Sequence, residues 1–437
     1  MKSNTNHLNL KKLSINAASW TFFGYGVSQA FRLLSNLILA RLLAPEHFGL
    51  IAIVTVFMIA LGMFSDVGIG PNIIQSERGE DEDFLNTAWT VQIIRGFILW
   101  LVCLALAWPM SIFYNQPDLA FLIPVSGLVA IIGGFNSTGI FSKSRDIDLK
   151  KQTVIELISQ AGAIVVMVAI ALVHASVWAL VAGSLFSAFV HMILSHRLVT
   201  MKNKFCWDHE AVHSLVTFGR WVMISTMLGF FVNSGASLIL GKFLSMTELG
   251  LFSIGVILSK VVEQIYNQIV GKIVVPVYAK IKHLSNDEIR ARVKKLRIAI
   301  MLAFLPPLWI LILFSNEIVA LLFDSRYQGA GWILQIFALS YVPIIIAGLG
   351  SFYLAMGDSV ILVRVTFAKA VIYFSSVYVG WLINGPNGMI YGMAVSNALL
   401  YFADIYAQRR YSIWLPKLDF LGFFISGLVI YFGYYLK

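Results

Sequence analysis

Charged residues are scarce in this sequence, and their scarcity excludes a soluble globular protein. Only 12% of the 437 residues are Asp, Glu, Lys or Arg, whereas 59% are hydrophobic. Soluble domains carry about 25% charged and about 45–50% apolar residues. The hydrophobic residues are arranged in runs long enough for helices of about 20 residues that cross a bilayer. The sequence therefore predicts an all-α polytopic membrane protein. The runs are too long for the roughly 10-residue strands of an outer-membrane barrel.

Cysteines and nucleotide-binding motifs are also few. The two cysteines, Cys103 and Cys206, lie far apart, which predicts neither a disulfide framework nor a paired metal site. The absence of a Gly-rich phosphate loop argues against direct ATP hydrolysis. No predicted outer loop clusters Arg, His or carboxylates, which argues against a membrane-embedded glycosyltransferase or polymerase.

One segment, His209-Glu210-Ala211-Val212-His213, fits the H-E-x-x-H pattern of zinc proteases. No third ligand follows at a recognisable spacing, and the segment lies in a polar loop at the mouth of a predicted helix. We therefore predict no metal, no cofactor and no enzymatic activity, and a membrane-embedded enzyme is the alternative that this pattern leaves open.

Thirteen apolar runs, separated by charged residues or by Pro, Gly and Asn clusters, predict thirteen transmembrane helices. Their approximate spans are 14–40, 47–70, 85–113, 118–142, 152–173, 176–197, 213–240, 247–280, 297–314, 329–356, 360–382, 387–408 and 417–436. Because the first run is long and contains Arg32, we expect no removable signal peptide.

The distribution of Lys and Arg predicts the orientation. The loops on the side of the N-terminus contain 21 of these residues, and the loops on the other side contain 4. Since basic residues concentrate in cytoplasmic loops, we expect a cytoplasmic N-terminus and, with an odd number of helices, a C-terminus outside. The net charge of +10 then indicates cytoplasmic loops and lipid contact rather than binding of nucleic acid.

An internal repeat relates the two halves at an offset of 201 residues. The run 37–43 aligns with 238–244, including a basic residue at the helix end, and Gly49-Leu50 falls on Gly250-Leu251. Six predicted helices separate the copies, so both halves have the same orientation, as in transporters built from parallel repeats. We predict a lobe of helices 1–6 over 1–210, a lobe of helices 7–12 over 211–411, and an extra helix within 412–437.

Basic residues within the predicted helices are the candidate site residues. Three of the seven, Arg220, Lys272 and Arg364, lie within a few turns of the cytoplasmic face and can extend to it. The other four lie deeper, where a charge costs about 2.5–3.5 kcal/mol unless it faces a cavity or a partner. These are Arg32, Arg95, Lys260 and Lys369.

The acids identified within the helices are fewer, and each could pair with a base or act in gating or ion coupling. They are Asp66, Glu156 and Glu263. Lys260 and Glu263 could neutralise each other at i,i+3, and Asp66 could cap a helix break in the run 65–71. The excess of bases favours a positively charged cavity for a phosphate-bearing substrate, with Arg as the bidentate partner.

Several segments, in order along the chain, resemble the bacterial polysaccharide and O-antigen flippases of the Wzx type. The resemblance extends over nearly the whole chain and is greatest to the branch of the colanic-acid transporters. The segments that carry it are Ile38-Leu39-Ala40-Arg41-Leu42-Leu43-Ala44-Pro45-Glu46-His47-Phe48-Gly49-Leu50, Asp66-Val67-Gly68-Ile69, Leu85-Asn86-Thr87-Ala88-Trp89, Arg145-Asp146-Ile147-Asp148-Leu149-Lys150-Lys151, and Leu322-Phe323-Asp324 with Gly331-Trp332.

The resemblance implies two six-helix lobes around a central cavity, as in the multidrug and oligosaccharidyl-lipid exporters. It implies the transfer of an undecaprenyl-diphosphate-linked oligosaccharide from the cytoplasmic to the outer leaflet of the inner membrane. Arg32, Arg95, Lys260 and Lys369 would then bind the diphosphate. The implied partners are the lipid-linked substrate, membrane lipids, and polymerase and chain-length proteins. Many relatives have fourteen helices, so the thirteen predicted here are a departure.

Two other functions remain open from the sequence. A cation-coupled exporter of small organic molecules could use the same fold, but its cavity should contain an excess of carboxylates. A scaffold that transports nothing would not need deeply placed charges.

Overall fold

The computed structural model describes residues 2–145, 150–199, 201–274, 277–278, 281, 284–348, 352, 356 and 358–435. Across these residues the regular elements are helices, and none is a strand. The chain divides into two compact units, unit 1 (Met1–Lys242) and unit 2 (Phe243–Lys437). The division falls one helix later than the predicted lobe boundary at 210/211, so the predicted lobe limits stay a prediction.

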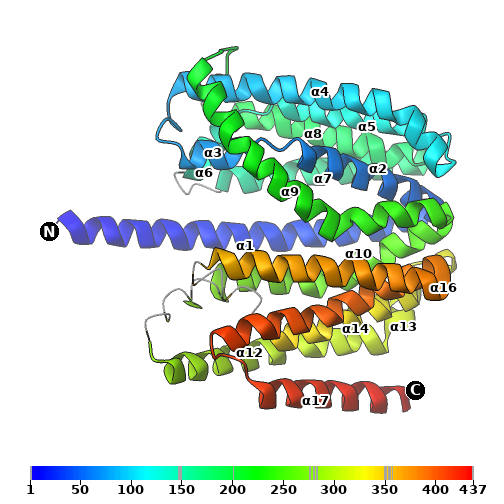
Figure 1. The fold of residues 1–437 in the computed structure, drawn as a ribbon. Coiled ribbons are helices and arrows are strands. Elements are labelled where there is room, and N and C mark those ends of the chain that lie inside the picture. The colour runs from blue at the N-terminus through cyan, green and yellow to red at the C-terminus, as the bar shows by residue number, and fades with distance from the viewer. Residues whose placement is uncertain are drawn as a thin grey trace. The chain divides into compact units, whose positions relative to one another are not determined.

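The helices of unit 1 are those labelled α1 to α9 in Figure 1. Their bounds are α1 Lys2–Leu42, α2 Pro45–Phe64, α3 Ile69–Gln75, α4 Glu82–Tyr114, α5 Leu119–Gly134, α6 Gly139–Arg145, α7 Lys150–Val173, α8 Trp178–Leu198 and α9 His209–Phe243. The start of α9 belongs with this unit because Ala211 and Leu215 are fully buried in a cluster with Ile73 and Phe84. Further along α9, the Leu238 carbonyl accepts a hydrogen bond of 2.9 Å from the Tyr114 hydroxyl.

Unit 2 contains the remaining elements. Their bounds are α10 Met246–Ile269, the π-helical turn η1 Val270–Val274, α12 Asn286–Leu313, α13 Ser315–Leu322, the 3₁₀ turn η2 Ser325–Ala330, α14 Gly331–Ala347, α16 Ser359–Arg410 and α17 Pro416–Tyr435. Capping boxes begin α10 and α12: Ser245 and Ser285 each accept from the backbone N–H three residues later, and Glu248 and Glu288 accept in return.

Every predicted span falls on a helix over most of its described residues. Residues 275–276 and 279–280 of the eighth span, and 349–351 and 353–355 of the tenth, lie outside the described residues. Within the described ranges, ten helices are long and apolar enough to cross a membrane. The other three predicted spans fall on α1, on the shorter α5 and on the second half of α16. The halves of α16 meet at Asn384 and Gly385, whose backbone is not helical. This break lies between the predicted spans 360–382 and 387–408.

Several predicted boundaries are wrong. The first span, predicted from residue 14, begins at Lys2, and the eighth and tenth spans, predicted to reach residues 280 and 356, end as α-helices at Ile269 and Ala347. Three further boundaries have a clear local cause. The second span, predicted to reach residue 70, ends at Phe64, because Gly68 takes a left-handed conformation at φ 60° before the short α3. The fourth span, predicted to reach residue 142, ends at Gly134, and α6 follows after a break. The ninth span, predicted to begin at residue 297, begins at Asn286, so α12 has a polar first part.

The two units repeat one packing pattern. In unit 1, α5 packs on α2, α4 and α8. In unit 2, α14 packs on α10, α12 and α16, and Asn397 in the second half of α16 donates to the Ser340 hydroxyl. The fourth and the tenth predicted helices therefore have corresponding neighbours, as the offset of 201 residues predicts.

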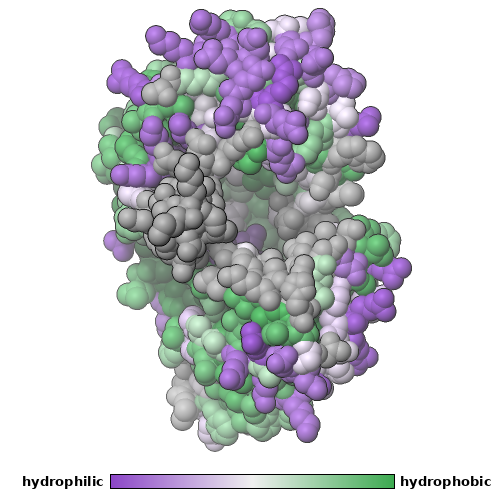
Figure 2. All heavy atoms as spheres, turned by 90° about the vertical axis from the view of Figure 1, so that its left-hand side faces the viewer, coloured by the Kyte–Doolittle hydropathy of each residue, from purple (hydrophilic) through white to green (hydrophobic). Residues whose placement is uncertain are grey.

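Hydrophilic residues gather at one end of unit 1, as the upper part of Figure 2 shows, and basic residues gather at one end of unit 2. In unit 1 this end carries the connection 76–81 and the segment 201–208. In unit 2 it carries the start of α12, where Arg290, Arg292, Lys294 and Lys295 are exposed. The count of Lys and Arg in the sequence predicts that these segments lie on the cytoplasmic side, and this orientation stays a prediction.

A buried ionic network joins α12, α14, α16 and α17 within unit 2. Arg297, which the charge count places in a cytoplasmic loop, is fully buried, so that placement is wrong. Its guanidinium pairs with Asp419 and donates to the Ile346 carbonyl. The other Asp419 oxygen accepts from the Tyr401 hydroxyl at 2.8 Å and from Trp414 Nε1 at 3.0 Å. Through these contacts α17, the helix outside the predicted repeat, is integrated into unit 2.

Candidate functional site

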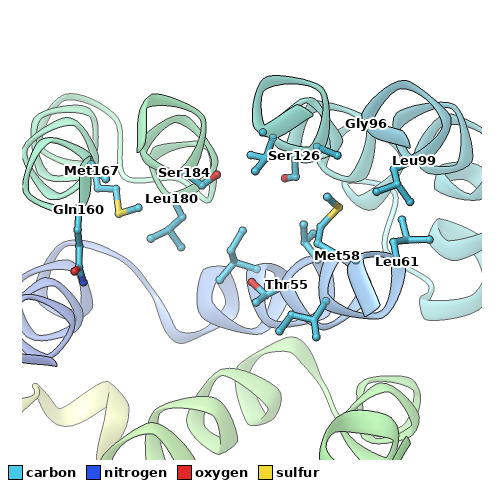
Figure 3. A pocket seen from close by; sticks show the side chains of 18 of the residues that line it. Thr55, Met58, Leu61, Gly96, Leu99, Ser126, Gln160, Met167, Leu180 and Ser184 are labelled. Atoms are coloured by element: carbon cyan, nitrogen blue, oxygen red, sulfur yellow. The ribbon is translucent and has the colours of Figure 1, made fainter. Parts of the chain in front are cut away.

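A cavity of about 740 Å³ lies inside unit 1 and is lined by residues of α1, α2, α4, α5, α7 and α8. Figure 3 shows Thr55 and Met58 of α2, Ser126 of α5 and Gln160 of α7 around the open space. Apolar side chains form most of the lining, and a few polar groups converge on it. Binding sites for small molecules have this composition and a volume of about 300–1,000 Å³.

Arg95 is one of the two charged residues in the described lining of this cavity. Its Nε donates to the Ser65 hydroxyl at 3.1 Å, and its Nη2 donates to the Gly62 carbonyl at 2.8 Å. Both acceptors lie where α2 ends, and both are neutral. The contacts fix the direction of the guanidinium, and no ion pair of Arg95 occurs among the described residues.

Arg32 on α1 is the other charged residue of the described lining, and its side chain is exposed. No hydrogen bond or ion pair of Arg32 occurs within the described part of the chain. Its helix is held against α7 by a reciprocal contact, in which Ser28 Oγ donates to Gln160 Oε1 at 2.8 Å and Gln160 Nε2 donates to the Ser28 carbonyl at 3.1 Å. The backbone that carries Arg32 is thereby positioned, and its guanidinium remains available.

The described residues that line the cavity include these two arginines and no Asp or Glu. A cationic site of this kind attracts anions, and guanidinium groups match the planar geometry of phosphate oxygens. The structure brings together Arg32 and Arg95, two of the four deeply placed bases that the sequence singles out, in the lining of one cavity.

One wall of the cavity is formed by close contact between α4 and α5. A Cβ atom at Gly96 would meet the Ala130 carbonyl oxygen at 2.5 Å, and one at Gly134 would meet backbone atoms of residues 92 and 93 at 3.1 Å. Small residues allow helices in membranes to approach in this way. Gln92 Nε2 also donates to the carbonyls of Gly133, Gly134 and Asn136 at 3.0–3.1 Å, which satisfies the groups left free where α5 ends.

The predicted acids of unit 1 do not line this cavity. Asp66 Oδ1 accepts from the Gly68 N–H at 2.9 Å and so stabilises the break between α2 and α3. Glu156 on α7 is exposed and accepts from Gln152 Nε2 at 3.0 Å.

Lys260, Glu263 and Lys369 lie in unit 2. Lys369 pairs with Asp404 at 2.8 Å, and Asp404 is almost completely buried. On α10, Lys260 and Glu263 are half-buried, and no ion pair joins them. Glu263 instead accepts from Asn267 Nδ2 at 3.2 Å. Asp404 and Asp419 were missed as acids within helices, although both lie inside predicted spans, so the predicted acid count of three was too low.

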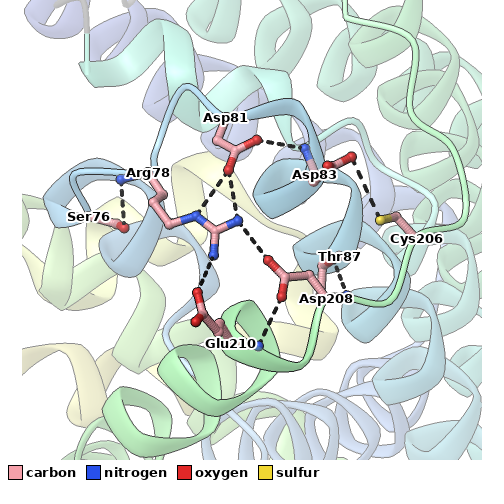
Figure 4. A network of polar contacts seen from close by, with 8 residues as sticks. All are labelled: Ser76, Arg78, Asp81, Asp83, Thr87, Cys206, Asp208 and Glu210. Carbon is pink, nitrogen blue, oxygen red and sulfur yellow. Dashed lines mark hydrogen bonds and ion pairs between the residues drawn. The ribbon is translucent and has the colours of Figure 1, made fainter.

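The H-E-x-x-H segment is part of an ionic network at the hydrophilic end of unit 1 (Figure 4). Arg78 bonds Asp81 at 2.8 Å and Asp208 at 2.6 Å and lies 3.5 Å from Glu210. Glu210, the residue that would be the base of a zinc protease, is thus an ion-pair partner of Arg78. The described His, Cys, Asp and Glu side chains include no group of three that could hold a metal ion.

Comparison with known protein sequences points to polysaccharide biosynthesis. Residues 38–331 match the model of a family described as polysaccharide biosynthesis protein. The lipopolysaccharide biosynthesis protein WzxC of Escherichia coli K12 is 21% identical over 427 residues, which cover 94% of this chain and 86% of WzxC. An uncharacterized membrane protein in the cps region of Klebsiella pneumoniae is 22% identical over 400 residues, covering 90% of this chain and 81% of that protein.

Solved structures share the fold. A lipid II flippase, MurJ, in an inward closed conformation has a TM-score of 0.73 at 12% identity, over 97% of this chain and 93% of MurJ. An inward-facing multidrug resistance transporter of the MATE family has a TM-score of 0.71 at 13% identity, over 88% of this chain and 94% of that transporter.

The predicted all-α membrane fold with repeated lobes is confirmed. The named neighbours are transporters and flippases rather than enzymes, in agreement with the prediction. Since the family match spans well over half of its length, this chain belongs to the polysaccharide biosynthesis protein family, as its resemblance to the Wzx-type flippases and their colanic-acid branch predicted.

Proposed function

We propose that the protein is a flippase that moves undecaprenyl-diphosphate-linked oligosaccharide repeat units across the bacterial inner membrane, from the cytoplasmic to the outer leaflet. The product would supply the synthesis of a surface polysaccharide such as O-antigen, capsule or exopolysaccharide. The observation that carries the proposal is the cavity of unit 1, whose described lining contains Arg32 and Arg95 and no carboxylate.

The chemistry of the substrate explains why such a cavity would be needed. A diphosphate that leaves water for a medium of low dielectric constant loses its hydration, and unpaired charge there is very costly. Arg95, oriented by Ser65 and Gly62, and Arg32, free to reorient, would neutralise the diphosphate. The polar lining groups, among them Gln160 and Ser184, would contact the sugar headgroup while the polyprenyl chain stays in lipid.

The cycle we propose is alternating access. The inward-open protein admits the headgroup from the cytoplasmic side, and movement of the repeated lobes exposes it outside.

The proposed orientation has a cytoplasmic N-terminus and an outer C-terminus. Lys260 and Lys369 are further proposed contacts of the diphosphate, and Asp66, Glu156 and Glu263 are proposed in gating or ion coupling. Polymerase and chain-length proteins are the proposed partners that use the product.

The lining argues against the alternative exporter of small organic cations. A cation site needs buried carboxylates, and the described lining of the unit 1 cavity has none. The nearby Asp66 bonds the backbone of its own turn.

Complementation of a bacterial strain that lacks its own flippase tests the proposal. Wild type should restore the surface polysaccharide, whereas Arg32→Ala and Arg95→Ala should reduce export by about 10–100-fold, the equivalent of a lost charge-assisted hydrogen bond of about 1.5–3 kcal/mol. Arg364→Ala, which removes an exposed cation of α16, is the matched control and should export normally. Export that persists in Arg32→Ala and Arg95→Ala at equal membrane levels would refute the assigned site.

A further inference from the structure

A second cavity, of about 320 Å³, lies within unit 2 at the end where α10 and α14 begin and where the two halves of α16 meet. This is the end opposite the start of α12 (Figure 1). Its lining combines two aromatic rings, two carboxamides and one carboxylate. These residues are Trp332, Tyr391, Asn384, Asn387 and Glu248.

The α16 hairpin places the two carboxamides at the edge of this cavity. A Cβ atom at Gly380 or at Gly388 would collide with the carbonyl group of the other, so the two halves approach closely just before they join. Gly385 has φ 54°, a left-handed conformation that glycine adopts without strain. Asn384 and Asn387 flank this turn and are exposed. No hydrogen bond of either side chain is present among the residues that the structure describes.

The aromatic pair comes from two different helices. Trp332 lies in the first turn of α14, directly after η2, and Tyr391 lies one turn beyond Asn387. Their ring centroids are 5.5 Å apart at an interplanar angle of 37°. Trp332 is partly buried, and Tyr391 is 46% exposed. The pair therefore offers ring surface to a ligand in the cavity.

Glu248 adds a fixed acceptor. Its Oε2 accepts from the Ser245 N–H at 2.8 Å and from the Ser245 hydroxyl at 2.9 Å, in the capping box that begins α10. The carboxylate is exposed and held in one orientation by this cap. It can accept from a ligand hydroxyl without a further loss of side-chain freedom.

We propose that this cavity, the unit 2 groove, binds a pyranose ring of a saccharide. The C–H groups of a pyranose carry partial positive charge, and they pack on the negative faces of aromatic rings. Vicinal hydroxyls both donate and accept, as carboxamides do, and they can donate to a carboxylate. The described lining of the groove contains no Lys or Arg, so these residues lack the charge to bind the diphosphate.

The position of the groove gives it a role in the proposed transport, and to that extent this inference rests on the proposed function. The opposite end of unit 2 carries the exposed basic residues of α12 and the basic end of α16, Arg409 and Arg410. Under the positive-inside rule the groove then faces the outside. There it holds a sugar of the headgroup after transfer, and its shape selects among sugars on the product side.

Saturation-transfer NMR on the full-length protein in nanodiscs tests the groove directly. The probes are methyl pyranosides of glucose, galactose, mannose, N-acetylglucosamine, rhamnose and glucuronic acid. We expect transfer to the ring protons of at least one glycoside with the wild type and with Trp332→Phe, and its loss with Trp332→Ala and Asn387→Ala. Trp178→Ala, which removes a partly exposed Trp at the start of α8 in unit 1, should retain the transfer.

The outcomes separate this inference from the proposed function. Arg95→Ala should still show the glycoside signal, because the groove lies in unit 2, although its export should fail. Absence of transfer to all six glycosides, transfer that survives Trp332→Ala, or transfer lost equally in Trp178→Ala would overturn the saccharide groove and leave the flippase proposal to the complementation assay. Conversely, normal export by Arg95→Ala would refute the cationic site whatever the glycosides do.

Discussion

The basic residues within the helices have different partners in the two units. In unit 1, Arg32 and Arg95 face a cavity, and the partners that the structure gives Arg95 are neutral oxygens. In unit 2, Arg297 pairs with Asp419 and Lys369 pairs with Asp404. Lys260 on α10 has no such pair among the described residues.

The difference shows that depth alone does not identify a functional charge. An arginine or lysine within a membrane helix is costly unless it has a partner or faces a cavity. When the partner is a buried carboxylate, the charge is explained by structure. When it is a neutral oxygen beside a cavity, the charge remains available for a ligand. The absence of a carboxylate partner in the described lining thus makes Arg32 and Arg95 stronger candidate contacts of the substrate than Lys369, which already pairs with Asp404.

The largest effect should follow from breaking the buried pair of unit 2. Asp419→Ala leaves Arg297 buried without its carboxylate and removes the acceptor of Tyr401 and Trp414, so we expect a loss of about 3–5 kcal/mol of stability. Thermal unfolding and yield of monodisperse protein in detergent measure the loss. Asp287→Ala, an exposed acid of α12, is the control. The double variant Arg297→Met with Asp419→Leu should recover much of the stability, and equal behaviour of Asp419→Ala and Asp287→Ala would contradict the structural role.

A carboxylate introduced into the unit 1 cavity should lower export, because it gives this cavity the kind of acid that pairs with the bases of unit 2. Thr55 lines the cavity and is exposed to it, so Thr55→Asp would introduce the negative charge that the described lining lacks (Figure 3). We expect export to fall about tenfold or more, because the added charge opposes an anionic substrate by about 1.4 kcal/mol or more. Thr55→Asn has nearly the same shape without the charge and should export nearly normally. Similar export by the Asp and Asn variants would mean that the charge of this cavity is irrelevant.

The sequence predicted the helices well because the bilayer imposes one strong rule, a long apolar run for each crossing. It also indicated the repeat, through the basic residue and the Gly-Leu pair at matching positions. Boundaries were wrong where polar chemistry overrides hydropathy. The break at Asp66 and Gly68 depends on a side chain that accepts from the backbone and on a left-handed glycine. The start of α12 depends on a cap at Ser285 outside the apolar run.

The candidate site could also be predicted in part, because a charge deep within a predicted membrane helix stands out in the sequence. Arg32 and Arg95 could be selected from depth and charge, and both line the cavity. Arg297 could not be recognised as buried, because its partner Asp419 lies 122 residues away in the sequence. Asp404 was overlooked although it lies on a predicted helix, and a search of the spans for every acid would have found it. The unit 2 groove leaves no local motif, since its residues come from α10, α14 and both halves of α16.

An intermediate effect is expected for the second ion pair of unit 2. Lys369→Ala leaves Asp404 almost buried and without its cation, so we expect a loss of about 1–3 kcal/mol. Lys369→Ala with Asp404→Ala removes both charges and should be more stable than Lys369→Ala alone, as measured by unfolding in detergent. If Lys369 acts chiefly on the substrate, the double variant will regain stability but not export. If the double variant is no more stable than Lys369→Ala, the pair does not stabilise the α16 hairpin.

The smallest effect should come from the ionic network at the hydrophilic end of unit 1, because its charges are hydrated (Figure 4). The Arg78 guanidinium lowers the pKa of the Asp81 and Asp208 carboxyls below the ordinary value of 3.8. A lowered carboxyl pKa stabilises the folded protein above the ordinary value, and this stabilisation is lost as the pH falls through the lowered pKa. Arg78→Ala should therefore unfold at a slightly lower temperature than wild type at pH 7 and low salt. The difference should shrink at high salt and vanish in strong acid.

Lys202→Ala, an exposed cation on the same segment as Asp208, is the control and should match wild type throughout. A difference for Arg78→Ala that persists in strong acid would show that Arg78 acts through packing rather than charge, and this end of unit 1 would then resemble the buried pairs of unit 2.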